Sequence, residues 1–128
     1  MGIPNSALAE ISGLVGNTGS KTAFTALANG SSNTVFAASQ TALVAENTIG
    51  GLGRGAADVS QVTTTQSNDT LQLTKTWTAS GAGGTIYEVG VFNNATSGGT
   101  MLARTVLSSS KTIAAGETYA LTYKVKFA

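Results

Sequence analysis

The sequence predicts a mainly β protein, an antiparallel β-sandwich that carries a short helix or arm at its N-terminus. Apolar and polar residues alternate in residues 71–79 and 119–127 with the period of two of half-buried strands. Clusters of glycine and asparagine separate the apolar runs, as turns do between strands. Because 128 residues suit a single core, we expect an arm at residues 1–20 and one sandwich domain of roughly seven or eight strands at residues 21–128.

The N-terminal segment is the one stretch with clear helical spacing. Its apolar residues recur at the positions of one helix face, and they are Ala7, Leu8, Ile11, Leu14 and Val15. We expect Asn5 or Ser6 to cap the start of this helix and Gly16 to cap its end. A helix this short is unstable alone, so its apolar stripe must pack on its own domain or on a neighbouring subunit. The candidate subunit contacts on the stripe are Leu8, Ile11 and Val15.

Between this arm and residue 70 the sequence favours short elements separated by turn residues. Valine and threonine favour strands, whereas the asparagine, aspartate and glycine pairs favour turns. The elements expected here, in chain order, are a strand at residues 22–28 ending in Asn29-Gly30, a helical turn at residues 39–45 capped by Ser39, a bend at Gly50-Gly51, a strand at residues 57–65 and a turn at Asn68-Asp69.

Two segments in the C-terminal half alternate in the manner of half-buried strands. Lys75 interrupts the first apolar face, and a strand-end or edge position would let its aliphatic stem pack while its ammonium group reaches water. The second segment carries threonine and lysine on its other side. The two apolar faces consist of Leu71, Leu73, Trp77 and Ala79, and of Tyr119, Leu121, Tyr123, Val125 and Phe127.

The stretch "NNATSGG", residues 93–99, lies between apolar runs at residues 86–92 and 101–107. Its asparagines tolerate left-handed backbone and its glycine pair adopts it freely, as a hairpin requires. A phosphate-binding loop would need a following helix, whereas the residues after Gly99 favour a strand. The sequence therefore predicts a hairpin turn and no phosphate site.

Composition excludes several classes of function. Charged residues make up 10% of the chain and the net charge is +1, so no basic surface is available for nucleic acid. The chain has no histidine and no cysteine, and its six carboxylates are scattered singly. We therefore predict no catalytic residues, no metal site and no cofactor, and expect that the protein is not an enzyme.

The low charge also indicates a surface that tolerates contact with neighbours, because a monomer usually carries roughly a quarter or more charged surface residues. We expect self-association for this reason. Arg54 stands isolated among glycines, where it is expected to pair with a carboxylate or with a neighbouring subunit; it is the fourth candidate subunit contact. No apolar run is long enough to span a membrane, and "MGIPNSALAE" lacks the pattern of a secretory signal, so we expect a soluble chain.

Several phrases of the sequence resemble small structural proteins of tailed bacteriophages. They include "GLGRGAADVSQVTTT", "EVGVFNNATSGGTMLAR" and the final "LTYKVKF", and the resemblance runs from about residue 24 to the C-terminus. It implies a β-sandwich virion component without catalysis, made in the cytoplasm of the bacterial host, whose partners are other virion proteins. The expected function is decoration or cementing of the capsid surface through contact with the major capsid protein.

Two alternatives remain open at this point. Within the same class, the chain is a tail, baseplate or fibre component that contacts a tail protein. From another class, it is a carbohydrate- or receptor-binding module, since β-sandwiches present loops and aromatic side chains well. The aromatic contacts of such a module would be Trp77, Tyr87, Tyr119 and Tyr123, of which three lie on apolar strand faces that are expected to fill the core.

Overall fold

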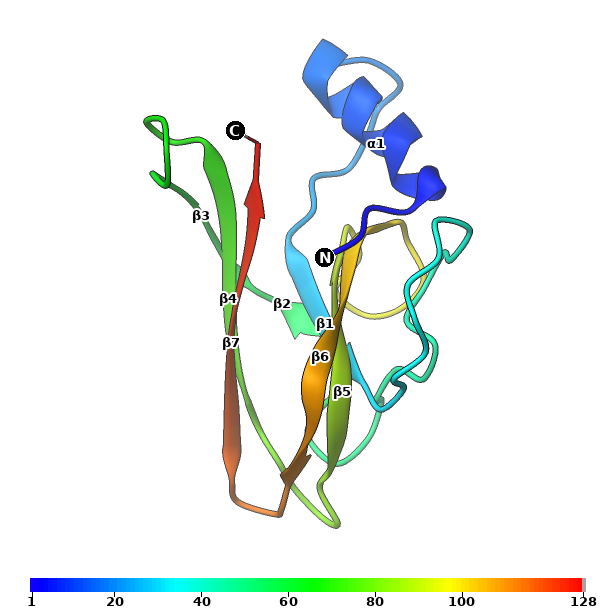
Figure 1. Cartoon of the computed structure of the whole chain (residues 1–128), viewed down its shortest axis with the longest axis vertical. Coiled ribbons are helices and arrows are strands. Elements are labelled where there is room, and N and C mark those ends of the chain that lie inside the picture. Colours follow the sequence, from blue (N-terminus) through cyan, green and yellow to red (C-terminus); the bar gives the residue numbers. More distant parts are fainter. Residues whose placement is uncertain (128) are drawn as a thin grey trace.

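The computed structural model describes residues 1–127 as two antiparallel β-sheets and one N-terminal helix (Figure 1). The larger sheet has the strand order β2-β1-β5-β6 and the smaller sheet the order β3-β4-β7. The predicted mainly β fold with a short N-terminal helix is confirmed. The elements are α1 (Asn5–Gly16), β1 (Ala26–Gly30), β2 (Gly55–Ala56), β3 (Asp58–Val62), β4 (Thr70–Thr78), β5 (Gly84–Phe92), β6 (Met101–Ile113) and β7 (Thr118–Lys126).

The chain passes between the two sheets where β2 leads into β3, where β4 leads into β5, and where β6 leads into β7. The last two connections lie at the same end of the molecule and hold the sheets together there (Figure 1). At the opposite end α1 lies against the larger sheet, while the smaller sheet ends freely (Figure 1). The sandwich is therefore closed at one end by covalent connections and open at the other.

The main core fills the space between the sheets. Leu73 and Trp77 from β4 and Val125 from β7 are buried against Leu27 and Val91 of the larger sheet. The Trp77 Nε1 group donates a hydrogen bond of 2.8 Å to the Gly53 carbonyl, so the indole nitrogen is satisfied inside the core. The alternation expected in β4 and β7 is thus the alternation of core and solvent faces.

The helix begins and ends one residue away from the expected caps. It starts at Asn5, after Pro4, and no side chain caps its first turn. It ends at Gly16, and Asn17 follows in the left-handed conformation at φ 49°, with its amide donating to the last carbonyls of the helix. The expectation that Asn5 or Ser6 and Gly16 act as caps is therefore wrong. Pro4 takes the N-cap position, since proline is tolerated at a helix start. Asn17 takes the position after the last turn, since asparagine also adopts left-handed backbone.

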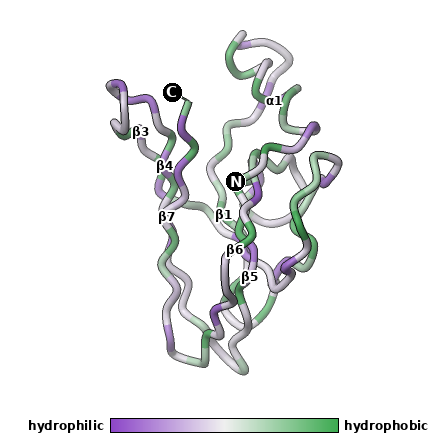
Figure 2. The backbone as a smooth tube through the Cα atoms, in the orientation of Figure 1, coloured by the Kyte–Doolittle hydropathy of each residue, from purple (hydrophilic) through white to green (hydrophobic). Residues whose placement is uncertain are grey.

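Residues 31–54 form an irregular loop over the outer face of the larger sheet, and the helical turn expected at residues 39–45 is wrong. The amides of Val44 and Ala45 donate to the Glu88 carboxylate instead of to helix carbonyls. Hydrophobic stretches of this loop, green in Figure 2, cover Phe92 and other apolar side chains of the outer face. The strand expected at residues 22–28 instead spans Ala26–Gly30, because β1 pairs with β5 over that range.

The strand-end or edge position expected for Lys75 is wrong: Lys75 lies in the middle of β4, the central strand of the smaller sheet, where it pairs with Leu121 of β7. β3 pairs with β4 only as far as Thr74, so Lys75 follows directly after the paired segment. Its ammonium nitrogen lies 5.5 Å from the centroid of the Trp77 ring. A lysine is accommodated in this central strand because the pairing with β3 stops one residue before it.

The hairpin predicted around residues 93–99 is confirmed. β5 and β6 pair antiparallel, and Phe92 faces Met101 across the base of the turn. Gly98 and Gly99 have φ of 61° and 69°, in the region where a side chain is strained. A Cβ on Gly99 would lie 2.6 Å from Asn93 Oδ1, so glycine is required there by space as well as by backbone conformation.

Candidate functional site

An apolar groove lies at the open end of the sandwich, between α1 and the free end of the smaller sheet. Its volume is about 300 Å³. One wall is formed by α1 and the segment before β1, and the other by β3, β4 and the residue after β7. We call this surface the apolar groove, and its lining residues are Ile11, Leu14, Val15, Ala23, Phe24, Thr25, Val59, Leu71, Leu102 and Phe127.

Large apolar side chains are exposed to solvent at the rim of the groove. Val15 is 84% exposed, Phe127 is 65% exposed, and Val59 and Leu14 are also exposed. The groove exists because only one part of the helix packs inward: Ala7 is fully buried and Ile11 packs partly against the core. The remaining apolar side chains of α1 face solvent in the isolated chain.

The structure places the candidate subunit contacts in two locations. Ile11 and Val15 line the apolar groove, whereas Leu8 is 57% exposed outside it. Arg54 lies far along the chain, beside the hairpin turn, and its side chain is only 3% exposed. Nothing in the isolated chain tests whether these residues contact another subunit, so that part stays a prediction.

Arg54 pairs with a carboxylate, which is the first of its two expected roles. Its Nε and Nη2 donate to the two carboxylate oxygens of Glu46 at 3.0 and 2.6 Å, a bidentate geometry. Its Nη1 donates to the carbonyls of Asn94 and Gly98, and its guanidinium carbon lies 3.6 Å from the Phe92 ring centroid. Arg54 therefore fastens the loop at residues 31–54 to the hairpin turn.

The hairpin turn uses the side-chain oxygens of Asn93 and Asn94 on its own backbone. Asn94 Oδ1 accepts hydrogen bonds from the amides of Thr96 and Ser97, and Asn93 Oδ1 accepts one of 2.7 Å from the Thr100 amide. These hydrogen bonds turn the backbone amides inward. A phosphate-binding loop would instead present such amides to its ligand. The geometry is that of a structural turn.

Sequence reasoning missed the most deeply buried polar pair of the protein. Glu88 is one of the six carboxylates that are scattered singly in the sequence, yet Glu88 and Arg104 are both fully buried, and Arg104 Nε donates to Glu88 Oε2 at 2.6 Å. Arg104 Nη1 reaches Gln40 Oε1 at 3.3 Å. The only signal in the sequence was a charged residue within each of two apolar strands, at Glu88 and Arg104.

Asp69 is a second carboxylate with a structural role, on the surface of the smaller sheet. The amides of Gln66, Thr64 and Thr65 all donate to it, as does the Thr64 hydroxyl. These hydrogen bonds, that from Gln66 first, hold the pKa of Asp69 well below its usual range. The carboxylate thereby fixes the turn that was predicted at Asn68-Asp69, where Asn68 has φ of 55°.

The aromatic side chains considered for a carbohydrate-binding module are largely internal. Trp77 and Tyr123 are buried in the main core, and burial raises the pKa of Tyr123 to about 12. Tyr119 stacks at a tilt on Trp77, with ring centroids 6.2 Å apart. Tyr87 is partly exposed but lies alone, at the irregular pairing between β5 and β6. These four aromatic side chains therefore form no flat surface for stacking on a sugar ring within residues 1–127.

Within residues 1–127, no three acidic, histidine or cysteine side chains come together in a way that would hold a metal ion. No helix there is both long and apolar enough to cross a membrane. Comparisons with protein-family models, with curated proteins and with solved structures find no significant match to this chain.

Proposed function

We propose that this chain is a structural accessory protein of a tailed bacteriophage particle, attached to a larger virion protein through the apolar groove. The single observation that carries this proposal is the exposure of large apolar side chains around the groove. Clustered apolar residues on a protein surface mark interaction sites more often than scattered ones do. A partner that filled the groove would remove Val15 and Phe127 from water.

The rest of the molecule supports a structural role. The charged groups that are most deeply buried, Glu88, Arg104 and Arg54, are used to hold the fold together. The surface has few charges, which suits a subunit packed among others. The assembly that we propose, a phage particle, rests on the resemblance of the sequence to phage structural proteins.

Capsid decoration is the leading form of this proposal, with the major capsid protein as partner. A tail, baseplate or fibre position is the second form, and copy number separates the two. Hundreds of copies per particle would indicate the capsid surface or the tail tube, whereas a handful would indicate a tail tip. The burial of Trp77 and Tyr123 in the core speaks against the carbohydrate-binding alternative, because neither ring is exposed to a sugar.

The proposal is tested in particles produced by a phage that lacks this gene and is supplied with the protein from a plasmid. Purified particles are analysed by quantitative mass spectrometry for copies of the protein. With Val15→Asp we expect an at least tenfold loss of copies per particle, because a charge in an apolar contact costs more than about 1.4 kcal/mol.

The matched control is Ile49→Asp, because Ile49 is 80% exposed, close to the value for Val15, but lies outside the groove. Both variants are expected to melt within a few degrees of the wild type, since exposed substitutions change stability by roughly 0.5 kcal/mol or less. Normal incorporation of Val15→Asp would refute attachment through the groove. Absence of the wild-type protein from purified particles would refute the virion assignment itself.

A further inference from the structure

The edge strands of the two sheets are protected to different degrees. β2 is two residues long, and β3 has five residues. β6 bonds to Gly2 through the amide and carbonyl of Arg104, and its register with β5 is irregular beside Glu88. β7 instead pairs with β4 over nine residues in unbroken register and has no second strand partner among residues 1–127. Short length, cover and bulges are common protections of a sheet edge, and β7 lacks all three.

The hydrogen bonds at the two ends of β7 show which of its backbone groups are free. The Ala79 amide donates to the Glu117 carbonyl at 2.8 Å, and the Phe127 amide donates to the Asp69 carbonyl at 3.0 Å. In an antiparallel pair, the backbone groups of every second residue point at the partner strand and those of the residues between point away. The odd-numbered residues of β7 therefore bond to β4. The amides and carbonyls that have no partner among residues 1–127 are those of Thr118, Ala120, Thr122, Lys124 and Lys126.

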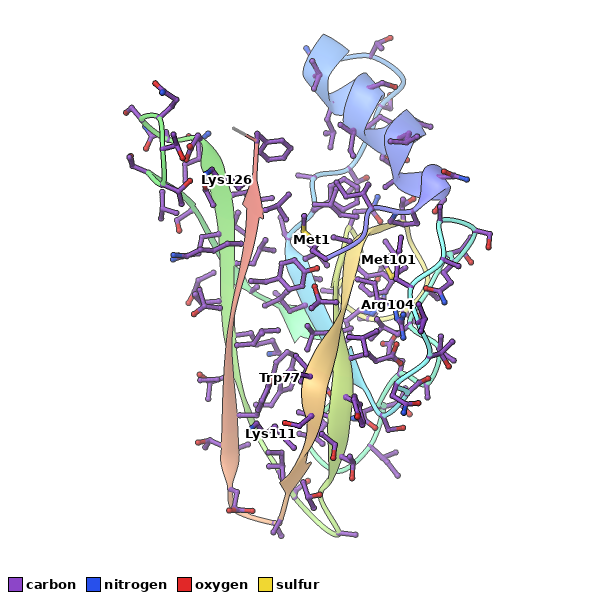
Figure 3. The ribbon with its side chains drawn as sticks, in the orientation of Figure 1. Met1, Trp77, Met101, Arg104, Lys111 and Lys126 are labelled. Atoms are coloured by element: carbon purple, nitrogen blue, oxygen red, sulfur yellow. The ribbon has the colours of Figure 1, made fainter. Side chains whose placement is uncertain are left out.

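Apolar side chains beside this edge are only partly covered. Figure 3 shows Trp77 between the two sheets, and Tyr119 lies opposite Trp77 in the β4–β7 pair, so the odd-numbered side chains of β7 point inward. Tyr119 and Leu121 are nevertheless only half-buried. A hollow of about 230 Å³ lies between β6 and β7, and Leu107, Leu121 and polar side chains of the same two strands line it. A strand added to β7 would cover the open side of these residues.

The sequence of β7 is compatible with pairing to itself. Thr122 is the middle residue of β7, so two copies that pair antiparallel about Thr122 overlap over the whole strand, and every free amide meets a free carbonyl. In this register Lys124 lies opposite Ala120 of the second copy, and Lys126 lies opposite Thr118. A centre at residue 124 or beyond would set lysine against lysine, which is unfavourable. The net charge of +1 leaves little repulsion between two whole chains.

We propose that two copies of this chain pair through the free edges of β7, antiparallel and centred on Thr122. The pairing joins their two smaller sheets into one continuous sheet with the strand order β3-β4-β7-β7-β4-β3. A strand is the occupant because an extended backbone matches a row of free amides and carbonyls at strand spacing. The pairing ends at Lys126 and does not involve Val15 of the apolar groove, so it does not depend on how the protein joins a particle.

Sedimentation equilibrium of the purified full chain over a dilution series tests the dimer. We expect twice the mass of one chain at the higher concentrations. Thr122→Pro removes the central amide of both strands and should weaken dimerisation at least about tenfold. The matched control is Gln61→Pro on β3, the other edge of the same sheet. The Gln61 amide also points away from β4, because its partner Leu71 bonds to β7, and this variant should dimerise like the wild type. So should Val15→Asp, which alters the apolar groove instead.

A pair of cysteine variants tests the register and decides the question if Thr122→Pro does not fold. The chain has no cysteine, so Thr122→Cys places a single thiol of each copy on the proposed two-fold axis. Opposite residues of a hydrogen-bonded pair have Cα atoms about 5.5 Å apart, which a disulfide can span. We expect mild oxidation to link Thr122→Cys into a dimer. Ala120→Cys, which is exposed on the same face and lies opposite Lys124, should stay unlinked.

A wild-type chain that stays monomeric at every concentration would overturn the proposal, as would a folded Thr122→Pro variant that dimerises as tightly as the wild type. A disulfide in Ala120→Cys in place of Thr122→Cys would overturn the register. Loss of the dimer in Val15→Asp alone would assign self-association to the apolar groove and overturn the role of β7. A monomeric wild type whose Thr122→Pro variant is lost from particles would overturn the second copy as occupant and assign the edge to a strand of another virion protein.

Discussion

The two faces of the larger sheet are covered in different ways. The inner face packs on the smaller sheet through apolar side chains such as Val91 and Leu73, and the strand backbones of both sheets are already paired within their own sheets. The outer face is covered by an irregular loop. The backbone amides of this loop lack strand partners and need other hydrogen-bond acceptors. Glu88 supplies two of these acceptors and is itself held by Arg104.

This difference shows what each kind of cover requires. A sheet covers another sheet mainly by apolar area, because its backbone is already paired. A loop must in addition be held by polar side chains that reach its amides and carbonyls. Gly30 belongs to the same arrangement, because a Cβ there would collide with the Glu88 carboxylate and with the Ala45 carbonyl, which lies 2.5 Å from the Cβ position.

The largest effect is expected when the polar support of the outer face is removed. Glu88→Ala leaves Arg104 buried without its counter-charge and leaves the amides of Val44 and Ala45 without their acceptor. We expect a loss of about 3–5 kcal/mol in the free energy of unfolding, measured by urea denaturation. Glu88→Gln is the control that keeps an acceptor oxygen, and it should lose less. Equal losses in the two variants would contradict this explanation.

The inner face is tested by Leu73→Ala, which opens a cavity between the sheets. Leu73 is fully buried, and such a truncation costs about 2–5 kcal/mol, again measured in urea. Hydrogen exchange separates the two faces: Leu73→Ala should raise exchange in both sheets, whereas Glu88→Ala should raise it first in residues 31–54. The same exchange pattern in both variants would mean that the loop and the core unfold as one unit.

A smaller effect is expected at the other fastening of the loop. Arg54→Lys keeps the charge but loses the bidentate pair with Glu46 and the bonds to the Asn94 and Gly98 carbonyls. We expect a loss of about 1–3 kcal/mol in the free energy of unfolding. Faster proteolysis within residues 93–99 is the accompanying readout, since the turn would be released. A variant as stable and as resistant as the wild type would show that the positive charge alone holds the turn.

The smallest effect is expected at Asp69, which holds a surface turn through the same kind of amide bonds that Glu88 makes in the interior. Its pKa is lowered from the ordinary value of 3.8, so the unfolded chain takes up the proton first as pH falls. The stabilisation is therefore complete above the ordinary value and is lost as pH falls from there towards the lowered pKa.

Asp69→Asn should accordingly melt at a lower temperature than the wild type at pH 7. Thermal melts from pH 7 down to about pH 2, well below the unperturbed aspartate pKa, should show the two proteins converging under acidic conditions. The Glu117→Gln variant serves as the control, because Glu117 accepts only one backbone amide bond, from Ala114. A difference that stays constant over the whole range would exclude the Asp69 carboxylate as its cause.

The N-terminal half and the C-terminal half differed in how well the sequence predicted them. The strands around Leu73, Tyr123 and the hairpin at residues 93–99 follow from local periodicity and turn chemistry, which act within a few residues. Residues 39–45 also carry a local helical pattern, yet they form a loop, because their amides find the Glu88 carboxylate 43 and 44 residues away. The helix also follows from local periodicity, but that periodicity does not show that Ile11 and Val15 line the apolar groove.

The sequence by itself determined the fold class, the helix, the alternating strands and the turns, because each depends on residues that are neighbours in the chain. Only the tertiary structure decided how these elements meet. The Glu88–Arg104 pair joins the two strands of a hairpin. Gln40, 64 residues away in the chain, accepts a hydrogen bond from Arg104. The apolar groove brings Val15 and Phe127 to one surface. Such contacts depend on which chain segments fold back on one another, and local periodicity carries no information about that.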